Sequence, residues 1–89
     1  MHTTDEHSGL QEAQAISDLY QRAAQELLHA YQRNKEATRH HAGGALRAAL
    51  HHARMSCAHS SAAHEYLTLA LEKSDQLCSI DLACAGQLS

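Results

Sequence analysis

The stretch that decides the fold is AQAISDLYQRAAQELLHA, residues 13–30, in which apolar residues recur at alternating spacings of three and four. These residues are Ala13, Ile16, Tyr20, Ala23, Leu27 and Ala30. Such spacing places them on one side of an α-helix, in the manner of a heptad repeat. Gln, Glu, Asp and Arg lie between them, as the solvated side of the same helix requires. The stretch therefore predicts an amphipathic helix, which we extend over residues 9–33.

Two further helices are predicted, over residues 40–58 and 61–80. In the first, Ala42, Leu46, Ala49, Leu50, Ala53 and Cys57 share one face. A helix boundary is expected at Ser60–Ser61, because Ser61 is a good N-terminal cap. A turn is expected near residues 33–38, with Gly43–Gly44 as the stronger breaker of a helix. The two glycines could instead be the turn itself, with the helix over residues 9–33 running on through Arg39, or could lie within a helix that another helix approaches closely. Residues 1–8 are expected to form a polar flexible tail, and residues 9–89 a single helical domain.

The composition argues for an all-α fold. The chain has 89 residues, enough for one domain, and contains no Phe, no Trp and no Pro. Residues that favour strands are scarce, whereas Ala, Leu, Gln, Glu and Arg are abundant. We expect an antiparallel three-helix bundle. If the boundary at Ser60–Ser61 does not form, the alternative is a long helical hairpin that dimerises to bury its apolar faces.

The core that this composition can build is thin. The apolar fraction is 44%, but most of it is Ala and Leu, and Ala buries little area. We therefore expect a protein partner, including a second copy of the chain, to complete the core. The residues expected to form this partner-binding or self-association seam are Ile16, Tyr20, Leu27, Tyr31, Leu67 and Leu71. The residues also expected to be buried are Tyr20, Leu27, Tyr66, Leu71 and Leu77.

The functional hypothesis is a small non-enzymatic protein of the adaptor, chaperone, inhibitor or regulator type, which acts by protein–protein interaction and needs no cofactor. The alternative is a metal-binding or metal-sensing protein. Imidazole, thiolate and thioether groups bind Zn, Cu and Ni. The stripe that would supply them on the helix over residues 40–58 is His41, His52, Met55, Cys57 and His59.

Other classes of function fit the sequence poorly. The formal net charge is −3, and the Lys and Arg residues do not gather on one face, so we do not expect a nucleic-acid partner. No apolar run approaches the ~20 residues that a membrane span needs, and the polar start of the chain is unlike a signal peptide, which favours a cytoplasmic location. Cys57, His59 and Glu65 are residue types of a nucleophilic site, but so small a helical domain seldom encloses a catalytic pocket, so we do not expect an enzyme.

Overall fold

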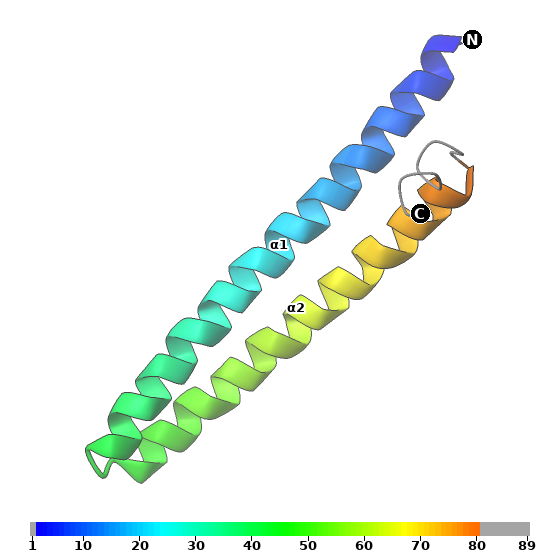
Figure 1. Ribbon diagram of the computed structural model, residues 1–89. Helices are drawn as coiled ribbons and strands as arrows, with labels where there is room; N and C mark the ends of the chain where they lie inside the picture. Colours follow the sequence, from blue (N-terminus) through cyan, green and yellow to red (C-terminus); the bar gives the residue numbers. More distant parts are fainter. Residues whose placement is uncertain (1, 81–89) are drawn as a thin grey trace.

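The computed structural model describes residues 2–80, which form two long antiparallel helices. Helix α1 spans His2–Ala42 and helix α2 spans Leu46–Ile80. The two helices lie side by side and give an elongated molecule of 64 × 28 × 13 Å (Figure 1). The predicted all-α class is confirmed, since the described residues contain helix and no strand.

The turn between the helices is made by Gly43 and Gly44. Gly44 has a φ of 82°, a left-handed conformation that glycine adopts without steric cost. The Ala45 amide donates to the His40 carbonyl at 2.9 Å, and the Gly44 amide donates to the His41 carbonyl at 3.1 Å. This pair of hydrogen bonds is the Schellman arrangement, which satisfies the last carbonyls of a helix. The interpretation of these glycines as a turn therefore holds, and Gly44 supplies the required φ.

Several predicted boundaries differ from those in the structure. Residues 2–8, expected as a flexible tail, are helical, and α1 continues past residue 33 to the glycine turn. Residues 58–61 are helical as well, so the described chain has two helices where the bundle prediction has three. Between residues 46 and 80 there is no Pro or Gly to break α2, and a serine cap signal alone does not end a helix that packs along its whole length. The predicted domain beyond Ile80 lies outside the described residues.

Small residues line the contact between the helices. The contact follows a heptad repeat, and we call these residues the alanine seam: Ile16, Ala23, Ala30 and Ala37 on α1, with Ala49, Ser56, Ala63 and Ala70 on α2. The Ser56 hydroxyl donates to the Ala30 carbonyl at 2.8 Å, which fixes the register of the two helices. All five buried hydrophobic residues are alanines of this seam. Because alanine has only a methyl group, the two backbones can approach closely.

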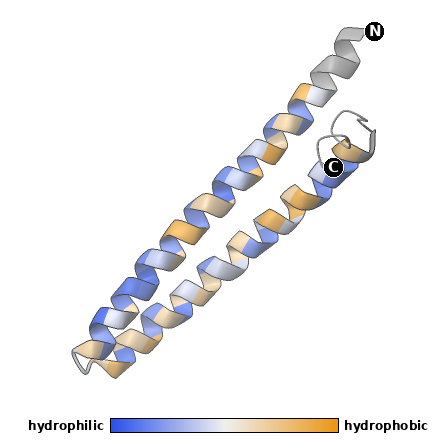
Figure 2. Ribbon diagram, in the orientation of Figure 1, coloured by the Kyte–Doolittle hydropathy of each residue, from blue (hydrophilic) through white to orange (hydrophobic). Residues whose placement is uncertain are grey.

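Beside the alanine seam, nine large apolar side chains of the described residues remain exposed. Tyr20 and Leu27 were expected to be buried, yet their exposed fractions are 44% and 49%. Leu71, also expected to be buried, is 57% exposed, whereas Tyr66 and Leu77 are half-buried. The reason is one of helical phase, since the three exposed residues flank the alanines rather than lying between the helices. Hydrophobic and hydrophilic residues alternate along the parts of α1 and α2 that Figure 2 colours by hydropathy.

Candidate functional site

The two helices present two different faces, one on each side of the alanine seam. Residues three or four positions from a seam residue flank it on one side or the other. Because the helices are antiparallel, the flanking rows of α1 and α2 meet along both long edges of the hairpin. One edge is apolar and the other is rich in histidine.

The apolar face consists of two heptad rows from each helix. On α1 the rows are Ala13, Tyr20, Leu27, Asn34 and His41, and Leu10, Ser17, Ala24, Tyr31 and Thr38. On α2 the rows are Leu46, Ala53, Ser60, Leu67 and Ser74, and Leu50, Cys57, His64, Leu71 and Cys78. Near the turn the two sets share one groove, in which Thr38 and His41 of α1 lie opposite Leu46, Leu50 and Ala53 of α2. This shared groove places both sets of rows on the same side of the molecule.

Charge is distributed in a sharply uneven way around the hairpin. Between residues 9 and 78, every Asp, Glu, Lys and Arg lies outside the rows of the apolar face. Seven of the nine large hydrophobic residues that remain exposed lie within those rows. They are Leu10, Tyr20, Leu27, Tyr31, Leu46, Leu50 and Leu71. The face is thus low in charge, with His41 and His64 as its titratable groups and the Lys35 ammonium 5.4 Å from the centre of the Tyr31 ring. A gathering of exposed apolar residues is typical of a surface that another protein covers.

The apolar face contains five of the six residues predicted as the partner-binding seam. Tyr20, Leu27, Tyr31 and Leu71 are exposed on it, and Leu67 is half-buried at its inner edge. Ile16 lies elsewhere, half-buried in the alanine seam between the two helices. The structure therefore brings most of the predicted residues together on one continuous surface.

The opposite edge, which we call the histidine face, carries polar pairs that cross between the helices. His59 Nδ1 lies 2.7 Å from Glu26 Oε2, and the His59 ring lies 5.1 Å from the ring of His29. Farther from the turn, Lys73 Nζ lies 3.9 Å from Glu12 Oε2. These pairs occupy flanking positions that hydrophobic residues take in an ordinary coiled coil. They therefore help to set how α1 and α2 align, and they bury little apolar area.

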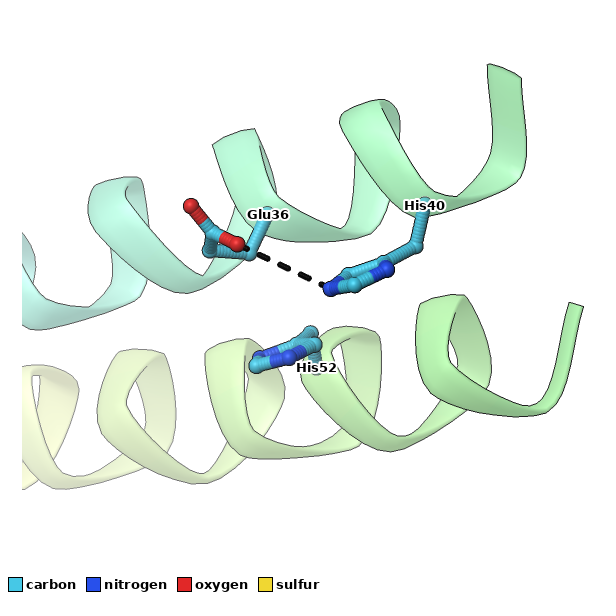
Figure 3. A group of neighbouring side chains, drawn as sticks. All are labelled: Glu36, His40 and His52. Carbon is cyan, nitrogen blue, oxygen red and sulfur yellow. Dashed lines mark ion pairs between the residues drawn. The ribbon is translucent and has the colours of Figure 1, made fainter. Parts of the chain in front are cut away.

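Three ligand-type side chains converge on this face close to the turn. Glu36 and His40 lie one helical turn apart on α1, and His52 reaches them from α2 (Figure 3). One oxygen or nitrogen atom from each lies within 4.8 Å of the other two. His40 Nε2 is 3.7 Å from Glu36 Oε2, and the His40 and His52 rings stack with centroids 5.0 Å apart and an interplanar angle of 4°. Among the described residues, this is the group of His, Cys, Asp and Glu that meets the spacing of a metal site.

Two arginines modify the charge of this cluster. A hydrogen bond from Arg39 lowers the pKa of the Glu36 carboxyl below its ordinary value of 4.5. Partial removal from water lowers the pKa of His52 below its ordinary value of 6.5, and the nearby His40, Arg33 and His51 act in the same direction. Arg33 Nη1 donates to His52 Nδ1 at 3.4 Å, so in this contact the ring proton of neutral His52 is on Nε2. Glu36 is thus ionised and His52 mostly neutral at pH 7.

The structure does not bring the predicted metal stripe together. His41 and Cys57 are exposed in the rows of the apolar face, and Met55 is half-buried outside those rows. His59 pairs with Glu26 on the histidine face, two helical turns beyond His52. Of the five residues, His52 alone belongs to the cluster that the structure forms.

Sequence reasoning missed Glu36 and His40. Their spacing of four residues is a signal that the sequence does contain, because it places two ligand groups on the same side of a helix. The choice between His40 and His41 depends on how α1 is rotated against α2, since neighbouring residues point about 100° apart. The alanine seam fixes that rotation, and the seam can be identified only when the register of α1 against α2 is known.

Comparison with protein-family models, with curated proteins and with solved structures finds no match to this chain. Within the part of the chain that the structure describes, neither helix has a stretch of the length and hydropathy needed to cross a membrane.

Proposed function

We propose that this protein is a small non-enzymatic interaction module that works by packing its apolar face against the helices of another protein chain. The first occupant of that face is a second copy of the chain, so that two hairpins form a four-helix assembly. The observation that carries this proposal is the separation of charge from apolar surface. The rows of the apolar face hold most of the exposed leucines and tyrosines and none of the charged residues between residues 9 and 78.

The exposed area supports a partner of this size. A monomeric protein of 9.7 kDa is expected to expose about 5,100 Å². The chain exposes 6892 Å², an excess of about 1,800 Å² over that expectation, in keeping with its elongated shape. If each copy buried its excess against the other, the interface would total about 3,600 Å², which lies within the range of obligate homodimers.

A second copy also suits the chemistry of the face. Its inner row on α2 holds the small residues Ala53, Ser60 and Ser74 beside the larger Leu46 and Leu67, so the side chains of a facing helix can enter between them. The face runs along both long helices, so the same face on a second copy has the same length. Pairing of identical faces about a twofold axis closes the assembly and leaves the charged sides in water.

The test compares two leucines of similar exposure on different sides of α2. Leu50, 52% exposed, lies on the apolar face, and Leu69, 46% exposed, lies outside it. We expect Leu50→Glu to convert a dimer into a monomer, because a carboxylate would be buried in the interface. The same change at Leu69 should leave the dimer intact. The measurement is molar mass by light scattering, with helical circular dichroism as the check on folding.

Two outcomes would overturn the proposal. A wild-type protein that stays monomeric at high micromolar concentration has no self-associating face. Equal dissociation by Leu50→Glu and Leu69→Glu would mean that association does not use the apolar face.

A further inference from the structure

We propose a second site, on the histidine face, where Glu36, His40 and His52 bind one divalent transition-metal ion of the zinc, copper or nickel group. Two imidazoles and one carboxylate are a ligand set that these ions accept. The site lies close to the glycine turn and joins α1 to α2, on the edge of the hairpin opposite the apolar face. It is therefore independent of the proposed function.

The geometry needs only side-chain movement to hold an ion. In a tetrahedral zinc site with bonds of ~2.0–2.1 Å, neighbouring ligand atoms lie about 3.4 Å apart. Here the three ligand atoms already lie within 4.8 Å of one another, and His40 Nε2 and Glu36 Oε2 are 3.7 Å apart. The backbone that carries them is regular helix on both sides, so rotation of the side chains closes the remaining distance. Water would complete the coordination of the ion.

A bound ion would compete with two guanidinium groups for these ligands. Arg39 is bonded to Glu36, and Arg33 donates to Nδ1 of His52. A histidine that binds metal through one ring nitrogen carries its proton on the other. If His52 binds through Nε2, its proton moves to Nδ1 and the contact from Arg33 breaks; if it binds through Nδ1, the metal replaces Arg33 directly. The arginines thus compete with the metal for its ligands. Removal of an arginine should therefore strengthen metal binding, whereas removal of a ligand should weaken it.

The histidine pairs in the sequence provide matched controls. His40 belongs to the cluster, whereas its neighbour His41 points to the apolar face. His52 belongs to the cluster, whereas its neighbour His51 does not. We expect His40→Gln and His52→Gln each to weaken zinc binding by about 10-fold or more, the scale on which metal sites respond to loss of supporting groups. His41→Gln should leave the affinity unchanged. His51→Gln should change it less than His52→Gln does, because the His51 ring packs 5.5 Å from the His52 ring without belonging to the cluster.

The experiment is calorimetric titration of the tag-free protein with zinc chloride, with circular dichroism to confirm that each variant is helical. We expect one zinc per chain, an unchanged molar mass on zinc addition, and tighter binding in Arg39→Gln. Histidine NMR signals should shift on zinc addition for His40 and His52 and stay in place for His41. Absence of saturable zinc binding, equal loss in the neighbouring histidine variants, or zinc-driven growth in molar mass would each overturn the site.

Discussion

Leu27 and Leu28 provide a direct test of which side of α1 contacts another chain. They are the same residue type at adjacent positions, and their exposed fractions are 49% and 52%. Leu27 lies in the row of the apolar face that is next to the alanine seam, whereas Leu28 lies about 100° from Leu27 around the helix, past the outer row of the face that holds Ala24 and Tyr31. Truncation to Ala therefore changes the isolated hairpin by similar amounts at the two positions. In a dimer that buries the apolar face, only Leu27 loses contacts with the partner.

The size of the effect follows from the remaining exposure. Complete burial of a leucine contributes about 1.5–3 kcal/mol, so burial of the exposed half of Leu27 contributes about 1 kcal/mol per copy. A twofold dimer contains two copies, so Leu27→Ala should weaken dimerisation by about 2 kcal/mol, or about 30-fold in Kd. The change Leu28→Ala should alter Kd by less than about twofold.

Sedimentation velocity over a concentration series measures both values of Kd. The account requires a large difference between the two variants under identical buffer conditions. Equal weakening by Leu27→Ala and Leu28→Ala, or weakening by Leu28→Ala alone, would refute the assignment of the apolar face as the interface.

Three further outcomes test the packing and the charges of the hairpin. Ala63→Leu should lower the free energy of unfolding by about 1–3 kcal/mol, because a larger side chain forces the helices apart at the alanine seam, whereas Ala58→Leu on the exposed side of α2 should be nearly neutral in the same urea titration. Ser56→Ala should cost about 0.5–1.5 kcal/mol in that titration through loss of the hydrogen bond to Ala30. The lowered pKa of His52 means that the folded chain binds fewer protons than the unfolded chain, so stability in metal-free buffer should fall as pH decreases through 6.5 and then level off below the folded pKa. The urea midpoint of wild type should therefore drop between about pH 7.5 and about pH 5.5, and His52→Gln should show a smaller drop; an equal drop would contradict this role of His52.

Much of the fold follows from the sequence, and the main error has a specific physical cause. The heptad spacing around Ile16, Ala23 and Ala30 correctly predicts an amphipathic helix that packs on one side. Hydrophobicity alone ranks Tyr20 and Leu27 as core, yet between the helices the flanking positions are taken by Glu26 and other polar residues that pair across the seam. A hydrophobic pattern predicts which residues would be stabilised by burial, but it does not predict whether they are buried within the same chain or against another chain.

The candidate sites differ in how far the sequence predicts them. The residues of the apolar face share one side of each helix, so periodicity alone places Tyr20 with Leu27 on α1 and Leu67 near Leu71 on α2. The cluster of Glu36, His40 and His52 depends on the register between two helices that are joined only at the turn. If the heptad assignment of α1 is moved by one residue, His41 takes the place of His40 on the side that faces His52. No local feature of the sequence decides between the two assignments before the alanine seam is known.

Protection of the Cys57 thiol is the measurement that tests the central claim most directly. Cys57 is exposed in the isolated hairpin and lies on the apolar face, between Leu50 and Leu71 along α2. If a second copy covers that face, alkylation of Cys57, followed by peptide mass spectrometry, should slow as the protein concentration rises through the Kd for dimerisation. In Leu50→Glu, the rate should stay at the fast value of the monomer at every concentration. A wild-type rate that is the same from dilute to concentrated protein would show that the apolar face remains open, and would contradict the account.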